Sequence, residues 1–157
     1  MKHKYLNPIL SIAVISLILS SCSGWLSSPA RDIYKEATVA WDNENYAHAF
    51  YLNSKAVLAD PGQKRPIKFM DENFDEGINK IKKFLENSKN TTNARIAEKR
   101  HSTYESLVAF YANVKEMKLP LKFKDKFKWE TKFVDYSDEL EQARKNVITV
   151  LYKRRDK

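Results

Sequence analysis

The sequence predicts an all-α fold. Glycine occurs only three times in 157 residues, and no Asn-Gly or Asp-Gly dipeptide joins two alternating apolar runs, so hairpin signals are missing. From residue 29 onward, apolar residues recur at spacings of three and four, which is the period of a helix with one buried face. We therefore expect residues 29–157 to form one all-α domain.

Two helices of moderate length come first. Ser28 followed by Pro29 is typical of a helix start, because proline at the first helical position loses no hydrogen bond. The first helix is expected over residues 30–42 and ends in the polar stretch 42–45. The second is expected over residues 46–59 and ends at Asp60-Pro61-Gly62. Its apolar face is formed by Tyr46, Ala49, Phe50, Asn53, Ala56 and Val57.

Two long helices and a C-terminal helix follow. The long ones are expected at about 66–87 and 93–117, each roughly 33 to 38 Å long, and the short turn at 87–92 predicts an antiparallel hairpin. The last helix is expected over residues 137–152. The apolar stripes of the three helices are Ile67, Met70, Phe74, Ile78, Ile81 and Leu85; Ala97, Tyr104, Leu107, Val108, Tyr111 and Val114; and Leu140, Ala143, Val147 and Val150.

The first helical pair has a repeat-like pattern of small residues. Ala37, Tyr46, Ala49, Ala56 and Pro61 follow one another at spacings of 9, 3, 7 and 5. This pattern resembles a tetratricopeptide repeat (TPR) over residues 30–63, in which alanines allow close helix contact and proline ends the second helix. An unrelated αα-hairpin with small residues at its crossing is the alternative.

The pattern departs from the family at four positions: Ile33 replaces a large aromatic residue, Glu36 a leucine, Ala40 a tyrosine and Asn53 an aromatic residue. Because a single repeat cannot bury its apolar face, the long hairpin is expected to supply the missing neighbour.

The resemblance implies a binding groove on the first helix. By register, its residues are Arg31, Tyr34, Thr38, Trp41 and Asp42. Arginine, tyrosine and tryptophan are enriched at interface hot spots, so this face is a candidate for holding a partner protein. In the alternative interpretation, Tyr34 and Trp41 are core residues that pack against the third helix.

The N-terminus resembles the signal of bacterial lipoproteins. Lys2 and Lys4 precede a nearly continuous apolar run over residues 5–19, which is too short for a membrane-spanning helix. The run ends in Leu19-Ser20-Ser21-Cys22, which is similar to a lipobox, and Cys22 is the only cysteine. The resemblance implies a signal peptide at residues 1–21, acylation of Cys22 by palmitate or related chains, and a tether at 22–28. We expect anchoring to the bacterial cell membrane or outer membrane, facing the periplasm or the cell surface.

A lysine–aromatic segment supports a second interpretation. Within residues 118–133, lysines alternate with aromatic residues, so an extended segment would present ammonium groups on one side. The residues concerned are Lys122, Lys124, Lys126, Lys128 and Trp129. Such a face could bind anionic lipid or a cell-wall polyanion. Alternatively, the aromatic residues pack onto the hairpin and the lysines stay solvated. Nucleic acid is not expected as a ligand in the envelope.

The sequence contains no constellation typical of catalysis. It has no glycine-rich phosphate loop and no nucleophile–base pair. We therefore expect no enzymatic activity, no metal, no cofactor and no small-molecule substrate. The sequence predicts a lipid-anchored protein–protein interaction scaffold whose partner is another envelope protein, with polyanion binding through 118–133 as the alternative.

Overall fold

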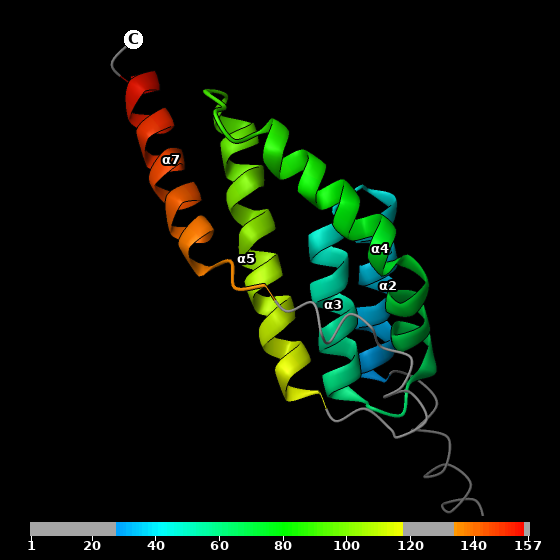
Figure 1. Cartoon of the computed structure of the whole chain (residues 1–157). Helices are drawn as coiled ribbons and strands as arrows, with labels where there is room; N and C mark the ends of the chain where they lie inside the picture. The colour runs from blue at the N-terminus through cyan, green and yellow to red at the C-terminus, as the bar shows by residue number, and fades with distance from the viewer. Residues whose placement is uncertain (1–27, 118–133, 156–157) are drawn as a thin grey trace, which may run out of the picture.

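The computed structural model describes residues 28–117 and 134–155, and this part of the chain contains helices and no strands. The helices are α2 (Pro29–Asp42), α3 (Tyr46–Ala59), α4 (Lys64–Asn87), α5 (Ala94–Glu116) and α7 (Ser137–Arg155) (Figure 1). The expected all-α fold is confirmed. The predicted ranges differ little from those observed: α4 begins two residues earlier, at Lys64, and α7 continues three residues beyond Tyr152.

The side chains that precede α5 and α2 form different hydrogen bonds. Asn93 caps α5, since its side-chain oxygen accepts hydrogen bonds from the backbone N–H groups of Arg95 (3.0 Å) and Ile96 (3.3 Å). Ser28 precedes α2 as expected, but its side chain does not cap the helix. The Ser28 hydroxyl instead accepts a 3.4 Å hydrogen bond from Gln63 Nε2. This bond joins the start of α2 to the residue preceding α4.

Small side chains form the contact between α2 and α3. Ala37 on α2 and Ala49 and Ala56 on α3 are all 0 % exposed. Ala37 and Ala49 also belong to one buried cluster together with Ala40 and Leu52. With only a methyl group at these positions, the two antiparallel helices can approach closely over their length. The three alanines of the repeat-like pattern are thus buried packing positions, whereas Tyr46 is half-buried and Pro61 is exposed.

Helix α3 lies between the two long helices. In Figure 1, α4 and α5 diverge from their shared turn, and α3 occupies the space between them. The Phe50 ring of α3 lies 5.5 Å from the ring of Phe74 on α4 and 5.7 Å from that of Phe110 on α5. The antiparallel hairpin expected of the long helices is present, and its arms contact α3 more extensively than they contact each other.

A glycine permits close contact between α3 and α4. A Cβ atom at Gly77 would lie 2.5 Å from Phe50 Cζ and 3.0 Å from Trp41 Cζ3. Such distances are shorter than van der Waals contact, so any larger residue would force the helices or the rings to move. Gly77 therefore lets two aromatic side chains lie against the backbone of α4.

Helix α7 packs along α5. Tyr136, just before α7, places its ring 5.8 Å from that of Tyr104 and 6.1 Å from that of Tyr111, both on α5. Ala143 of α7 is 1 % exposed at this contact. None of the helices described is long and apolar enough to cross a membrane.

Candidate functional site

The five predicted groove residues on α2 fall into two groups. Tyr34 and Trp41 lie against α4, with their rings 6.4 Å and 5.2 Å from that of Phe69. Arg31 and Asp42 are exposed. Thr38 is half-buried, and its hydroxyl donates a 2.7 Å hydrogen bond to the carbonyl of Lys35.

Trp41 makes the most contacts of this group. Its ring is 4.8 Å from that of Tyr46 and 5.9 Å from that of Phe50, and it packs against the main core cluster. This environment favours the interpretation of Trp41 as a packing residue. Among the described residues, Arg31 and Asp42 are the exposed members of this group, at the two ends of α2.

The other candidate residues from the sequence, namely Cys22 and the lysine–aromatic set Lys122, Lys124, Lys126, Lys128 and Trp129, lie outside the described residues.

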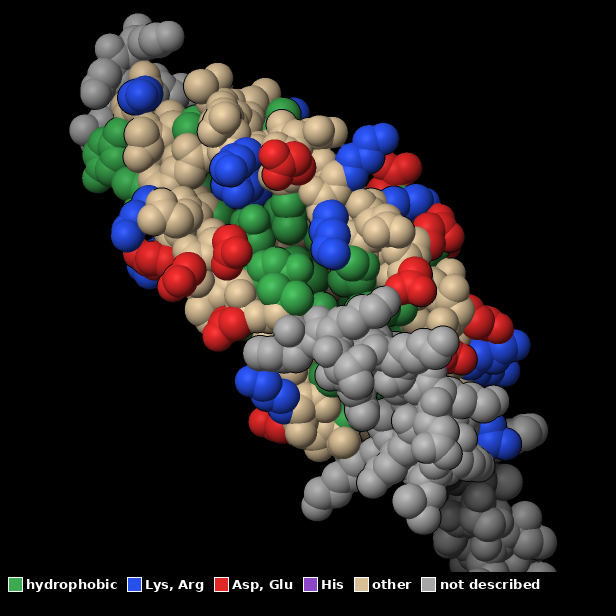
Figure 2. Space-filling model, viewed as in Figure 1, with side chains coloured by type: hydrophobic (Ala, Val, Ile, Leu, Met, Phe, Trp, Pro, Cys, Tyr) green, Lys and Arg blue, Asp and Glu red, His purple; other side chains and the backbone are tan. Residues whose placement is uncertain are grey.

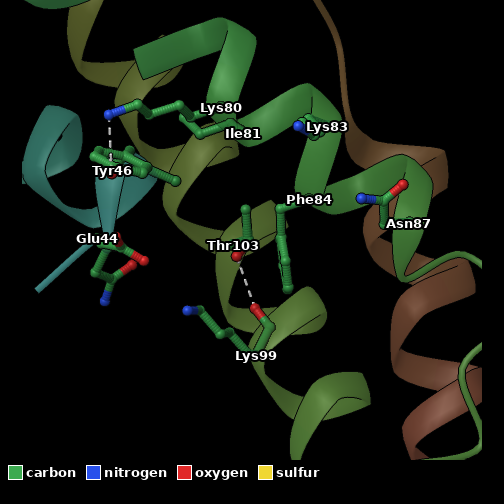
Figure 3. A pocket seen from close by; sticks show the side chains of 11 residues that line it. Glu44, Tyr46, Lys80, Ile81, Lys83, Phe84, Asn87, Lys99 and Thr103 are labelled. Atoms are coloured by element: carbon green, nitrogen blue, oxygen red, sulfur yellow. Dashed lines mark hydrogen bonds between the residues drawn. The ribbon is translucent and has the colours of Figure 1, made fainter. Parts of the chain in front are cut away.

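The sequence analysis missed a pocket that opens where α4 and α5 diverge. Its volume is about 370 Å³, and Figure 3 shows its walls. The turn before α3 and the first residues of α3 form one side, the C-terminal half of α4 the second, and the N-terminal half of α5 the third. The lining residues are Glu44, Asn45, Tyr46, Ala47, Lys80, Ile81, Lys83, Phe84, Asn87, Lys99 and Thr103. Three segments far apart in the sequence thus build one site.

Lys80 and Tyr46 form one wall of this pocket. Lys80 Nζ donates a 3.2 Å hydrogen bond to the Tyr46 hydroxyl and lies 4.8 Å from the centre of its ring. The same ammonium group forms a 2.7 Å ion pair with Glu76 on the preceding turn of α4. The hydrogen bonds from Lys80 to Glu76 and then to Tyr46 raise its pKa, so Lys80 is protonated at neutral pH.

Lys99 and Phe84 form the opposite wall. Lys99 Nζ lies 5.4 Å from the centre of the Phe84 ring, a geometry in which the ring face attracts the cation. In Figure 3, the Phe84 side chain points from α4 toward α5, where Thr103 and Lys99 lie on successive turns. Neither Lys83 nor Lys99 forms an ion pair with another residue of the described ranges, so both ammonium charges are uncompensated there.

Hydrogen-bond donors dominate the polar lining. The pocket brings together three lysines and two asparagines, and it includes the first turn of α3, where backbone N–H groups have no partner within the helix. Glu44 is the only carboxylate among the lining residues. Apolar groups of Tyr46, Ile81 and Phe84 lie beside these donors. The chemistry of the lining fits a ligand that carries negative charge next to an apolar group.

Glu44 has an unusual backbone conformation. Its φ angle is +58°, the only positive value at a non-glycine residue among those described. The N–H of Glu44 bonds to the carbonyl of Trp41 at 2.9 Å, and that of Asn45 bonds to the carbonyl of Ala40 at 2.8 Å. This is the Schellman ending of a helix, where glycine is the usual residue at the left-handed position. The strained turn places Glu44 at the edge of the pocket.

A charge pattern in the sequence could have indicated this site. Residues 80–100 contain seven lysines and arginines but only two glutamates, whereas residues 60–79 contain five acidic and three basic residues. Lysine and arginine side chains also lie close to exposed hydrophobic surface in the middle of the face shown in Figure 2. The reversal of charge along α4 marks the basic half of the helix that lines the pocket.

Within the described part of the chain, no group of three His, Cys, Asp or Glu side chains is placed to hold a metal ion. Comparisons with protein-family models, with curated proteins and with solved structures found no match. The candidate sites are therefore defined by the geometry and chemistry of this chain alone.

Proposed function

We propose that the chain is a lipid-anchored envelope protein whose helical domain binds a partner protein and has no catalytic activity of its own. The observation that carries this proposal is the pocket between α4 and α5, which is lined by charged and aromatic side chains from three segments. Pockets of this kind, with a few convergent polar groups beside apolar walls, are typical of binding sites. The buried alanines between α2 and α3 support a TPR-like scaffold that holds this site in place.

The anchor belongs to the same proposal. Leu19-Ser20-Ser21-Cys22 is the lipobox-like segment, and acylation of Cys22 would attach the domain to the membrane of a bacterial envelope. In the second candidate function, residues 118–133 bind a cell-wall polyanion or anionic lipid. The observation in its favour is the alternation of lysine and aromatic residues in that segment.

Site-specific photo-crosslinking in the native envelope tests the partner proposal. A photoreactive amino acid would be placed singly at Asn87 on the pocket, at Arg31 on α2, or at Lys55 on α3, all of which are exposed. We expect one defined protein adduct from Asn87, from Arg31 or from both, and none from the control position Lys55. The proposal is wrong if no protein adduct forms at either test position, or if Lys55 gives the same adduct in equal yield.

A further inference from the structure

We propose that the pocket between α4 and α5 binds an acidic segment of the partner protein, in which a carboxylate side chain is flanked by an apolar residue. This inference rests on the proposed function and adds to it the chemistry of the partner.

The charge of the lining selects an anion. Lys83 and Lys99 line the pocket from different helices, and within the described residues neither ammonium forms an ion pair. Lys80 lies between Glu76 and Tyr46, so part of its charge is already compensated. A carboxylate that reached Lys83 or Lys99 would gain a charge-assisted hydrogen bond, the stronger kind of hydrogen bond in proteins.

The apolar walls select a flanking apolar group. Ile81 is 4 % exposed and lines the pocket together with the rings of Tyr46 and Phe84. An inorganic anion would leave these surfaces in contact with water. A leucine or phenylalanine beside the acidic residue would cover them and bury apolar area.

The position of the pocket favours a partner protein over the anchoring membrane. In Figure 1, the start of α2 and the turn between α4 and α5 lie at opposite ends of the molecule. From Cys22 to Ser28 the chain advances six residues, which can span at most about 20 Å. A lipid on Cys22 would hold the start of α2 near the membrane, so the basic end of the domain would face away from the lipid surface.

Glu44 allows a separate test of the preference of the pocket for an acidic ligand. As the only carboxylate of the lining, it opposes the entry of an acidic ligand. Replacement of Glu44 by glutamine removes this repulsion and keeps a residue of similar size at the same backbone position. The variant is therefore expected to bind an acidic segment more tightly than the parent protein.

Peptide titration of the full-length mature protein in detergent tests the proposal. The probe is a short fluorescent peptide with two glutamates flanking a phenylalanine, and its control replaces both glutamates by glutamine. We expect the glutamate peptide to bind at least about tenfold more tightly than the glutamine peptide, and salt to weaken its binding. Lys83→Gln and Lys99→Gln should each weaken binding by about fivefold or more, and Glu44→Gln should strengthen it.

Lys82→Gln is the matched control, because Lys82 is an exposed residue of α4 that does not line the pocket. The same change of charge there should alter affinity by less than about twofold. Equal binding of the two peptides, or an equal effect of Lys82→Gln and Lys99→Gln, would overturn the proposal. It would also be overturned if inorganic phosphate or phosphatidylglycerol vesicles displaced the peptide completely, since the ligand would then be a phosphate group.

The crosslinking and peptide-binding experiments distinguish failure of the proposed function from failure of the acidic-segment proposal. A protein adduct at Asn87 without selective peptide binding would leave the partner function standing and refute the acidic segment. Selective peptide binding without any protein adduct in the envelope would retain the chemistry of the pocket and refute a stable protein partner.

Discussion

Trp41 decides between two interpretations of the α2 face. Its ring contacts those of Tyr46, Phe50 and Phe69, and a Cβ atom on Gly77 would almost touch it. We therefore expect Trp41→Ala to lower the free energy of unfolding by about 3 kcal/mol, because large-to-small changes leave a cavity. Circular-dichroism melting measures this loss. A variant that melts like the parent but no longer captures the partner would restore Trp41 as a groove residue.

Gly77 allows a second prediction at the scale of one residue. At an exposed helical position, replacement of glycine by alanine usually stabilises the protein by up to about 1 kcal/mol. Here the added methyl group would lie 2.5 Å from Phe50 Cζ and 2.8 Å from Phe50 Cε2. We expect Gly77→Ala to destabilise the domain by about 1–3 kcal/mol, as overpacking does in other cores. An increase in the melting temperature would show that α4 and α3 can separate at little cost.

For the helical pair of α2 and α3, we predict the effect of a larger side chain at Ala56 on stability. Ala56 is 0 % exposed, so a larger side chain cannot be placed there without moving a neighbouring element. Ala56→Leu should cost about 1–3 kcal/mol of stability, measurable by chemical denaturation. Ala59→Leu, at an exposed position near the end of the same helix, is the control and should have little effect. Equal midpoints for Ala56→Leu and the parent would contradict tight packing around Ala56.

The tyrosine contact between α5 and α7 predicts a loss of stability at alkaline pH. Burial raises the pKa of Tyr111 from 10.0 to about 12, and burial also raises the pKa of Tyr136. Because the folded state holds these protons more tightly than the unfolded chain, their stabilising effect is complete below pH 10 and is lost as the pH rises to about 12. Denaturation midpoints measured across this range should fall.

Tyr111→Phe is the control for this effect, because phenylalanine keeps the ring and has no proton to lose. The midpoint of this variant should fall less steeply above pH 10 than that of the parent. Ultraviolet titration of the tyrosinates provides a second measurement. Ionisation of every tyrosine near its ordinary pKa would show that the Tyr111 hydroxyl is solvated in the folded protein.

The helices were predictable from sequence because their signals are local. The stripe from Ile67 to Leu85 repeats at the helical period, and the buried residues of α4 follow it. The arrangement of α4 and α5 was not predictable in this way, since it depends on the Phe50 ring packing against both Phe74 and Phe110. Such contacts join positions far apart in the chain, and periodicity contains no information about them.

The candidate site was predictable only in part for the same reason. The register of the repeat-like pattern gave the residues of α2, but not that Tyr34 and Trp41 would meet Phe69 of α4. The pocket combines Tyr46, Lys80 and Lys99, which no local motif connects. The excess of basic residues over 80–100 was its one visible signal, and a run of charge alone does not distinguish a pocket from a solvated face.

At the scale of the whole molecule, the membrane anchor can be tested directly. Cys22 is the only cysteine, so its sulfur is the only atom that could carry a thioether-linked lipid. Cys22→Ser should abolish incorporation of a labelled fatty-acid analogue and leave the precursor uncleaved. Ser21→Ala, which keeps a small residue before the cysteine, should still be labelled. Label retained by Cys22→Ser would refute the lipoprotein interpretation.

The helices differ in how many other helices they pack against, and this difference determines which helix unfolds locally most easily. Helix α3 is enclosed by α2, α4 and α5, whereas α7 packs chiefly along α5 and leaves Ile148, Leu151 and Tyr152 exposed. Elements with few buried contacts open in small cooperative units, while enclosed ones exchange their amide hydrogens only when the whole domain unfolds. Amide exchange should therefore be fast in α7 and slowest in α3. Undocking of α7 would uncover Tyr104 and Tyr111 while the alanine-lined pair of α2 and α3 stays folded.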